Sequence, residues 1–484
     1  MPAASNPAAV AAFFMKAEIW SGEAILFRIA LEVEMWDMRP ECGSRRTKKV
    51  LTRLYLLLFA FLLATGTPCV CAQTYSPSAP DASPRIAALG KEVQMGGRDA
   101  AAQFWKDVKH SGAPLIESVA DEPHYSYVTF LWHGDASTRN VVIFDGVAGY
   151  DAKDRMVRLA DTDVWYKTYK VRNDARFAYY FSPNDPLTSV NEVKGDEAMR
   201  TRLAMFQTDP LNPHRCPTTF GAYGSEASFV ELPEAPKIAW DESSEAFAHG
   251  KVEVTTIQSA ILKRDKKLWV YTPANFSAHG RRYPLLVLFD GDRNVMWMPK
   301  ILDILIAKKK IPPMVMVMTD ESVPAMRREE LPCNPAFADF LAKELVPWTR
   351  EKYHATDDPA QTIVAGSSYG GLASVFAGLR HSEIFGNVIA LSGSFFWKPD
   401  SEKEDQWLVR QMEASPKLPL RFYQEVGLME GPTFEIKPNQ HMRDVLQSKG
   451  YPVGYFEFNG GHSYLNWAGG MERGLIFLAK RPAS

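Results

Sequence analysis

The chain contains little cysteine, no excess of one charge and no apolar run of the length that a membrane-spanning helix needs. Only five of its 484 residues are cysteine, which excludes a small scaffold held together by disulfides. The 55 Lys and Arg residues nearly balance the 57 Asp and Glu residues, for a formal net charge of −2, so the basic field that attracts nucleic acid is missing. What remains is the composition of a folded globular protein, long enough for two domains and a removable segment.

The N-terminal region has the order of a secretory signal peptide. A basic cluster at residues 45–53 precedes an apolar run at 54–64, and the small residues at 70–72 fit a signal peptidase site. We therefore assign residues 1–72 to a leader and signal peptide, with the signal at about 45–72, and predict a periplasmic or secreted mature protein. The apolar run is shorter than the roughly 20 residues of a spanning helix; an uncleaved membrane anchor is the alternative.

Residues 1–44 precede this signal, and we expect translation to begin later than Met1. Cleavage after Ala72 removes three of the five cysteines and leaves Cys216 and Cys333. These two either form one disulfide, which an oxidising compartment allows, or remain as buried thiols.

Short β-rich segments dominate the first half of the predicted mature chain. From residue 125 they alternate aromatic or β-branched residues with polar ones, and Gly, Asp and Asn turns separate them. This spacing predicts an immunoglobulin-like β-sandwich in a domain over residues 84–230. The acidic, proline-containing stretch 231–250 is interpreted as an interdomain linker. The strands are predicted at 125–132, 140–144, 164–171 and 176–181.

Residues 251–484 have the alternating texture of an α/β domain. A predicted β-hairpin at 252–272 is followed by continuous apolar runs that alternate with helical segments. Such runs imply a mainly parallel sheet covered on both faces, with sites in the crevice beyond the carboxyl ends of the strands. The strands are predicted at 284–289, 314–318, 362–365, 387–391, 420–426 and 453–458, and the helices at 300–308, 335–348, 372–379 and 439–449.

A candidate nucleophile lies between one of these strands and the helix that follows it. Residues 366–370 read Gly-Ser-Ser-Tyr-Gly and fit the nucleophile elbow G-x-S-x-G, in which a sharp strand-to-helix turn exposes the serine hydroxyl. The spacing places Ser368, rather than Ser367, at the apex. The surrounding order of strand, elbow and helix predicts the α/β-hydrolase fold, and a Gly-Ser turn without reactivity is the alternative.

A serine hydroxyl needs a general base, and in this fold the chain order is serine, acid, histidine. His462 follows the last predicted strand in a Gly-Gly-His-Ser loop, whereas His441 lies in a helical, exposed-looking stretch. The loop after the strand 420–426 offers Glu430 as the acid that orients the imidazole. A solvated loop glutamate and a mechanism that rests on serine and histidine alone are the alternatives for Glu430.

An acyl-transfer site also needs two backbone donors for the oxyanion. The Tyr369 amide, directly after the nucleophile, is one candidate, and the amide of Gly291 or Asp292, after the strand 284–289, is the other. Asp290 and Asp292 also raise the question of a metal site. Two carboxylates without histidine partners are weak evidence for one, so no metal is predicted.

Taken together, these motifs resemble the enterochelin (enterobactin) esterase family, relatives of the esterase D group. In the second domain the similar stretches are 289–291, 330–334, 364–372, 391–394 and 460–462, with Leu286, Arg327, Trp397 and Trp467. In the first domain they are 128–132, 161–165 and 209–213. The resemblance covers nearly the whole of the predicted mature chain.

The resemblance implies hydrolysis of the ester bonds of a ferric catecholate trilactone. In that case Arg327 is a candidate for gripping the anionic complex, and Trp397 and Tyr464 are candidates for lining the catechol pocket; a structural ion pair and a place in the core are the alternatives. No cofactor is expected, because iron enters only as part of the substrate. The partner is then a small-molecule ester, with no nucleic acid and no stable membrane span after cleavage of the leader.

Two departures from the family leave the substrate open. The familiar two-domain members are cytoplasmic, whereas this chain carries an export signal, and Ser463 replaces the acidic residue that usually follows the histidine. One alternative is a carbohydrate-directed feruloyl or acetyl esterase, or an acyltransferase with the same catalytic parts. Another is a non-catalytic exported siderophore-binding protein, against which the presence of both Ser368 and His462 argues.

Overall fold

The computed structural model describes residues 83–217, 226–239, 242–243 and 247–480. All of them belong to one compact unit, Thr74–Ser484. The predicted leader and signal peptide over residues 1–72 lie outside the described residues. In the part that is described, none of the helices combines the length and apolar character that crossing a bilayer would require.

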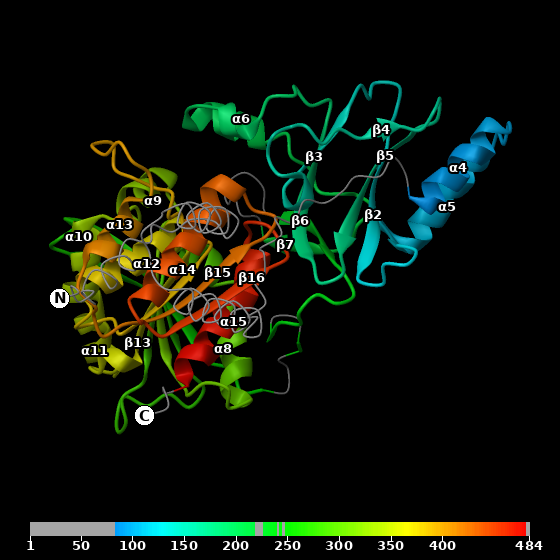
Figure 1. Ribbon diagram of the computed structural model, residues 1–484. Coiled ribbons are helices and arrows are strands. Elements are labelled where there is room, and N and C mark those ends of the chain that lie inside the picture. The colour runs from blue at the N-terminus through cyan, green and yellow to red at the C-terminus, as the bar shows by residue number, and fades with distance from the viewer. Residues whose placement is uncertain (1–82, 218–225, 240–241, 244–246, 481–484) are drawn as a thin grey trace, which may run out of the picture. The chain divides into compact units, whose positions relative to one another are not determined.

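The N-terminal part is built from two antiparallel sheets packed face to face (Figure 1). Phe130 in one sheet meets Tyr179 and Phe181 in the other, with 4.6 Å between the ring centroids of Phe130 and Tyr179, so the alternating apolar residues form the core between the sheets. The first sheet has the order β1 (Leu115–Ser118), β2 (Tyr125–His133), β5 (Val164–Arg172), β4 (Val157–Arg158). The second has the order β3 (Val141–Phe144), β6 (Arg176–Pro183), β8 (Glu226–Glu231), β7 (Arg215–Pro217).

Helices flank this β-sandwich. Ser83 caps the first, α4 (Pro84–Gln94), by accepting a hydrogen bond from the Ile86 amide. The amphipathic helix α5 (Ala100–Ser111) places Phe104, Trp105 and Val108 in a small core of its own. A third helix, α6 (Asp196–Leu203), precedes β7.

An eight-stranded, mainly parallel sheet forms the C-terminal part. Six neighbouring strands are parallel, and β10 and β9 add an antiparallel edge. Every residue of β12 and β14 is buried, as expected for strands that are covered on both faces. The order is β16 (Val453–Phe458), β15 (Arg421–Gly427), β14 (Asn387–Leu391), β13 (Thr362–Ser367), β11 (Leu285–Leu288), β12 (Val315–Thr319), β10 (Arg264–Thr272), β9 (Lys251–Ser259).

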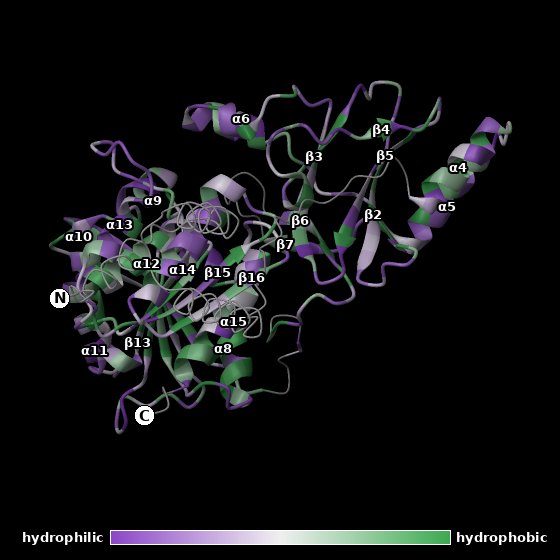
Figure 2. Cartoon of the chain, viewed as in Figure 1, coloured by the Kyte–Doolittle hydropathy of each residue, from purple (hydrophilic) through white to green (hydrophobic). Residues whose placement is uncertain are grey.

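Alternate residues of these strands pack into two hydrophobic cores, one on each face of the sheet. Val287 of β11 packs with one group of helices, and Leu286 and Leu288 pack with α8 (Met298–Ala307) and α15 (Tyr464–Ala479) on the opposite face; Figure 2 shows the apolar character of α8. The group on the first face is α10 (Pro335–Phe340), α11 (Val346–Lys352), α12 (Tyr369–Arg380), α13 (Trp407–Ala414) and α14 (Lys437–Ser448). The remaining helices are α7 (Gly291–Asn294), α8 (Met298–Ala307), α9 (Pro324–Glu330) and α15 (Tyr464–Ala479). The predicted α/β-hydrolase architecture with a preceding β-sandwich is therefore confirmed.

Several helices, α6, α7, α9, α13 and α15, were not predicted, and two regions show why expectation and structure differ. The predicted helix 335–348 is interrupted by a π-helical turn at Leu341–Leu345 before α11 continues it. Pro347 explains the break, because it has no amide to donate to the preceding turn. No helix was predicted for α15, because its glycines have low helix propensity and weaken the helical signal. A Cβ on Gly470 would lie 2.6 Å from Glu425 Oε2, so these glycines let the helix lie directly on β15.

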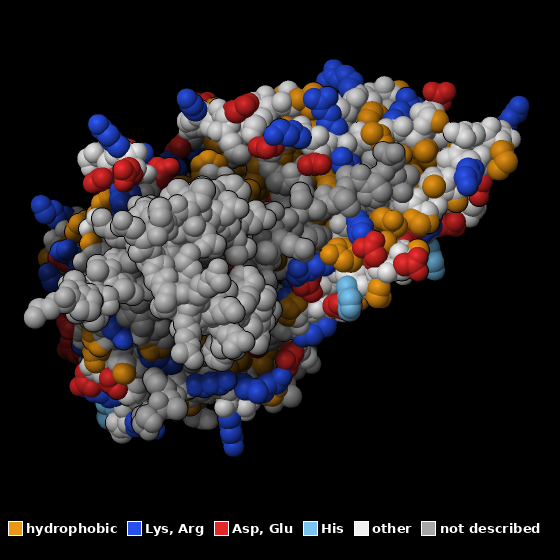
Figure 3. Space-filling view, viewed as in Figure 1, with side chains coloured by type: hydrophobic (Ala, Val, Ile, Leu, Met, Phe, Trp, Pro, Cys, Tyr) orange, Lys and Arg blue, Asp and Glu red, His pale blue; other side chains and the backbone are white. Residues whose placement is uncertain are grey.

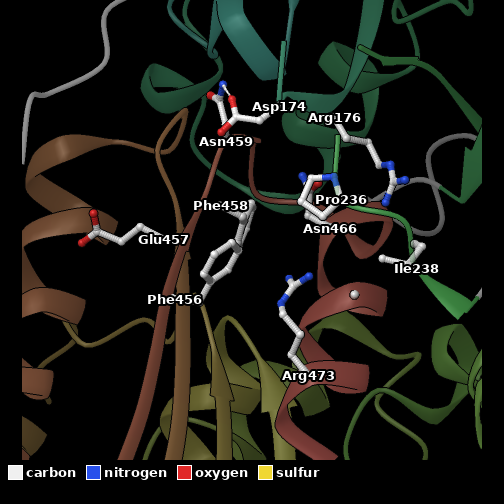
Figure 4. A pocket seen from close by; sticks show the side chains of 11 residues that line it. Asp174, Arg176, Pro236, Ile238, Phe456, Glu457, Phe458, Asn459, Asn466 and Arg473 are labelled. Atoms are coloured by element: carbon white, nitrogen blue, oxygen red, sulfur yellow. Dashed lines mark hydrogen bonds between the residues drawn. The ribbon is translucent and has the colours of Figure 1, made fainter. Parts of the chain in front are cut away.

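The β-sandwich and the eight-stranded sheet meet at the end of β16. The Arg176 amide donates to the Asn459 carbonyl at 3.0 Å, and Asn459 Nδ2 donates to Asp174 Oδ1 at 2.8 Å. A cavity of about 40 Å³ lies beside these contacts, with Arg473 and Ile238 on its wall (Figure 4). Ile238, in the predicted linker 231–250, packs into the core around α15, so this part of the segment is anchored to the C-terminal part.

The two cysteines that follow the predicted cleavage site are free. Cys216 and Cys333 are both buried thiols, which decides between the two states left open by the sequence. On the surface, basic and acidic side chains lie intermixed on the face that Figure 3 shows, in keeping with the balanced charge.

Candidate active site

Ser368 occupies a strained position between β13 and α12. Its backbone has φ 58° and ψ −124°, in a region that a serine seldom adopts and that is found where a fold constrains a functional residue. The turn is tight: a Cβ on Gly366 would lie 2.6 Å from the carbonyl carbon of Gly370, so only glycine fits there. Ser367 is the last residue of the strand. The structure thus places Ser368 at the apex of the turn.

His462 and Glu430 form a hydrogen-bonded pair. The imidazole Nδ1 lies 2.7 Å from Glu430 Oε2, and the glutamate side chain is completely buried. Its other oxygen, Oε1, accepts the Gly427 amide at 2.8 Å and the Ser392 hydroxyl at 2.5 Å. Since a carboxylate on Nδ1 holds the proton on that nitrogen, Nε2 is left as the basic atom.

Trp467 fixes the imidazole from the side. The rings of His462 and Trp467 meet edge to face with 4.7 Å between their centroids. The indole Nε1 donates to the Ser392 hydroxyl at 3.0 Å, which itself donates to Glu430. One hydrogen-bonded chain therefore orients both members of the pair.

The loop 392–394, which follows β14, joins this pair to Ser368. Ser394 Oγ lies 3.4 Å from Ser368 Oγ, and the Ser394 amide donates to the Ser368 carbonyl. At the other end of the loop, Ser392 contacts Glu430. The side chains in question follow β13, β14, β15 and β16, which are successive neighbours in the parallel sheet, and this is the edge at which the sequence predicts a site.

The candidate oxyanion donors also lie at this edge. The strands β11 and β13 are paired in parallel, and a Cβ on Gly370 would lie 3.5 Å from Phe289, so the elbow and the loop after β11 are in contact. Tyr369 begins α12, and Gly291 and Asp292 begin α7. Amides in the first turn of a helix have no acceptor within it, which makes these three amides available in principle to an oxyanion.

A buried ion cluster holds the loop after β11. Glu321 Oε2 accepts the Asp290 amide at 2.7 Å, and its other oxygen lies 3.0 Å from Lys266 Nζ. Lys266 also binds Glu330 at 2.5 Å, and Glu321 and Lys266 are each about 1% exposed. Burial raises the pKa of Glu321 to about 7, against the effect of Lys266. The backbone conformation of Asp290, with φ 54°, therefore depends on a carboxylate from another element.

Arg327, a candidate substrate-binding residue, lies on Asp290. Its Nε and Nη2 donate to the two carboxylate oxygens at 2.6 and 2.8 Å. Burial alone would raise the pKa of Asp290, but the guanidinium outweighs burial and lowers it. Both oxygens of Asp290 serve this ion pair, which leaves little basis for a metal site there. A role for Arg327 in binding substrate remains a prediction.

The two predicted pocket aromatics are mainly packed inside. Trp397 is half-buried and contacts Trp407 edge to face, with ring centroids 6.1 Å apart. Tyr464 is 3% exposed, packs edge to face on Trp467, and accepts a long hydrogen bond of 3.4 Å from Arg293. His441 is held by Gln406 on the exposed side of α14.

Several side chains of this centre carried no assigned role in the sequence. Three of them lie in stretches that support the family resemblance, namely Ser392, Ser394 and Trp467. The resemblance was therefore a signal from which a role for them could have been predicted. Glu321 and Lys266 had no such signal, because only their burial distinguishes them from other charged residues.

This fold and site define an esterase of the α/β-hydrolase class. The Esterase family model matches residues 259–478, and the model of the enterochelin esterase N-terminal domain matches residues 127–241. The iron(III) enterobactin esterase of Escherichia coli O6:H1 is 30% identical over 396 residues, which cover 78% of this chain and 96% of that relative. The chain belongs to the enterochelin (enterobactin) esterase family and is a carboxylic ester hydrolase.

Solved structures agree. The enterobactin esterase of Shigella flexneri, crystallised in the presence of enterobactin, has a TM-score of 0.62 at 28% identity and covers 76% of this chain and 95% of its own. The ferric enterobactin esterase of Salmonella typhimurium has a TM-score of 0.65 at 26% identity, with coverages of 78% and 98%.

The buried cluster behind the β11 loop generates a prediction for Glu321. Glu321→Leu removes the acceptor of the Asp290 amide, and we expect kcat to fall by about tenfold or more, the scale of a disturbed oxyanion donor, with little change in KM. Glu321→Gln keeps an oxygen in place and is the matched control, with a smaller loss. Steady-state kinetics on a p-nitrophenyl ester, with melting temperatures of both variants, provide the check; equal kcat losses would contradict this role.

Proposed function

We propose that this protein hydrolyses the ester bonds of a ferric catecholate siderophore of the enterobactin trilactone class, through Ser368, His462 and Glu430. The His462–Glu430 pair, linked through the loop 392–394 to a serine in a strained turn, is the observation that carries the proposal. The names of the relatives supply the substrate class: they are iron(III) enterobactin esterases from several bacteria.

In this mechanism the Ser368 hydroxyl attacks an ester carbonyl carbon while His462 Nε2 takes its proton. Glu430 stabilises the imidazolium that forms. The carbonyl oxygen becomes an oxyanion, for which the Tyr369 amide and the amides at the start of α7 are the proposed donors. Collapse of the tetrahedral intermediate breaks the ester bond, and the imidazolium returns its proton to the leaving alkoxide.

Water completes the cycle. His462 removes a proton from water, the hydroxide attacks the acyl-serine, and the acid product leaves as Ser368 regains its proton. Each turnover consumes one water and one ester bond, so a trilactone is first opened and then cut into monomers. No step calls on a cofactor, and iron takes part only as cargo of the substrate.

An exposed aromatic pair supports an aromatic substrate. Phe434, which is 64% exposed, meets Phe396 edge to face with 5.8 Å between ring centroids. Phe396 follows the loop that contacts Ser368, and Phe434 lies in the π-helical turn Pro432–Ile436, just after Glu430. An exposed aromatic surface beside the reacting groups suits a catechol ring.

We further propose that the protein is exported and that its signal peptide is removed after Ala72, on the strength of the basic cluster, apolar run and small residues of the N-terminal region. N-terminal sequencing of the protein recovered from the producing cells is expected to begin at Gln73. An intact N-terminus in a membrane fraction would instead indicate an anchor.

Substitutions at the proposed triad should abolish turnover without unfolding the protein. Ser368→Ala and His462→Ala are each expected to reduce kcat by several orders of magnitude, and Glu430→Gln by less. The assay follows release of catecholate monomers from ferric enterobactin by chromatography, with a feruloyl sugar ester as the competing substrate. Full activity of Glu430→Gln would remove it from the triad, and preference for the feruloyl ester would overturn the substrate class.

The aromatic pair should affect recognition and leave the chemistry unchanged. Phe434→Ala is expected to raise KM for the ferric catecholate by about five- to tenfold, the scale of one lost aromatic contact, and to leave kcat/KM for p-nitrophenyl acetate unchanged. Phe456→Ala, at an exposed phenylalanine of β16, is the matched control. An equal loss on both substrates would show that Phe434 supports the loop instead of the ligand.

A further inference from the structure

A turn of the N-terminal β-sandwich reaches the loop that carries His462. The turn consists of Asp145 and Gly146, directly after β3. A Cβ placed on Gly461 would lie 3.3 Å from Asp145 Oδ1 and 3.4 Å from the Cα of Gly146. Gly461 precedes the histidine, so a side chain of the first domain is packed against the base of the catalytic loop.

Asp145 is an unusual residue for a turn of this kind. It is 2% exposed and adopts φ 71°, and its Oδ1 accepts the Gly146 amide at 2.7 Å. Its second oxygen, Oδ2, is also buried, and the Tyr150 hydroxyl interacts with the carboxylate and lowers its pKa. Burial of the ionised carboxylate still lowers stability, and groups of this kind occur more often at functional sites than elsewhere.

Titratable groups face this carboxylate from both domains. Tyr150 and Cys216 approach it within the β-sandwich, and His462 and Glu430 approach it from the catalytic part. Burial raises the pKa of Asp145 to about 6; the Gly146 amide, Tyr150 and His462 oppose this effect, and Glu430 adds to it. A further carboxylate, Glu435, lies close to Glu430 and His462: one carboxylate oxygen of each glutamate and one ring nitrogen of the histidine are within 4.8 Å of one another.

We propose that Asp145 is a positioning residue for the esterase centre: through the Gly461 backbone and its own negative charge it holds His462 and favours the imidazolium formed during catalysis. The inference rests on the proposed role of His462 as general base. It makes the β-sandwich a working part of the active site. Asp145 does not touch the substrate and acts only through the histidine.

The negative charge of Asp145 gives His462 an electrostatic stabilisation that a neutral residue at this position would not give. An imidazolium forms each time His462 takes the serine proton, and a nearby anion stabilises it. Because folding raises the pKa of Asp145, its contribution to stability is present at low pH and is lost as the pH rises through about 6. At neutral pH the ionised residue therefore reduces folding stability while it assists the base.

Asp145→Asn separates these two effects. Asparagine accepts the Gly146 amide and tolerates a positive φ, so the shape of the turn is kept and only the charge is removed. We expect kcat for a p-nitrophenyl ester to fall about threefold or more at pH 8, and the acid limb of kcat/KM to move about half a unit to lower pH. The melting temperature at pH 8 should rise or stay unchanged. Asp174→Asn, at the Asn459 contact of the same interface, is the matched control with an unchanged pH profile.

Tyr150→Phe gives a second measurement that leaves Asp145 in place. Loss of the hydroxyl raises the pKa of the carboxylate further, so activity relative to the unaltered protein should be lowest near pH 6 and recover toward pH 8. Superimposable pH profiles for both variants and the unaltered protein would overturn the inference. Fluorophosphonate labelling of Ser368 in the unaltered protein separates failure of this inference from failure of the proposed function. Absence of labelling would overturn the proposed function itself.

Discussion

The proposed active centre depends on the buried carboxylate of Glu430. Its oxygens receive the Gly427 amide, the Ser392 hydroxyl and the imidazole of His462, so three loops converge on one side chain. A buried anion is stable only when its hydrogen bonds are made in full. Glu430 meets this requirement, and in doing so it ties the loops after β14, β15 and β16 to one another. The histidine is thereby placed by the same set of hydrogen bonds that satisfies the buried carboxylate.

A second buried carboxylate has the same function on the other side of Ser368. Glu321 takes the Asp290 amide and is neutralised by Lys266, while Asp290 is neutralised by Arg327. Each loop around the serine is thus fixed by charges that lie behind it, out of contact with solvent. Preorganised backbone donors of this kind need no rearrangement when an oxyanion forms. Phe434, the exposed residue proposed to contact the substrate, takes no part in these buried ion pairs.

Much of this arrangement could be predicted, because apolar runs and short motifs in neighbouring residues determine it. The strands β14 and β16 have the limits expected from their apolar runs; in β14 the unbroken run reflects burial on both faces of the sheet. The elbow, the histidine loop and Glu430 were proposed in the same way, from short motifs next to those strands. Glu321 and Asp145 could not be found, because their partners lie far away in the chain and no local period marks them. Arg327 shows a further limit: charge alone does not tell an ion pair with Asp290 from a ligand contact.

The glycines of α15 have a consequence for catalysis. The helix begins two residues after His462 and lies on β15 so closely that Gly470 has no room for a side chain beside Glu425. The distance between α15 and β15 therefore determines where the first turn of the helix lies relative to the sheet. It also determines the position of the His462 imidazole, which precedes that turn. A methyl group at Gly470 requires either the Glu425 carboxylate or the helix itself to move, and a shift of the helix carries His462 with it while every group of the proposed triad stays chemically unchanged.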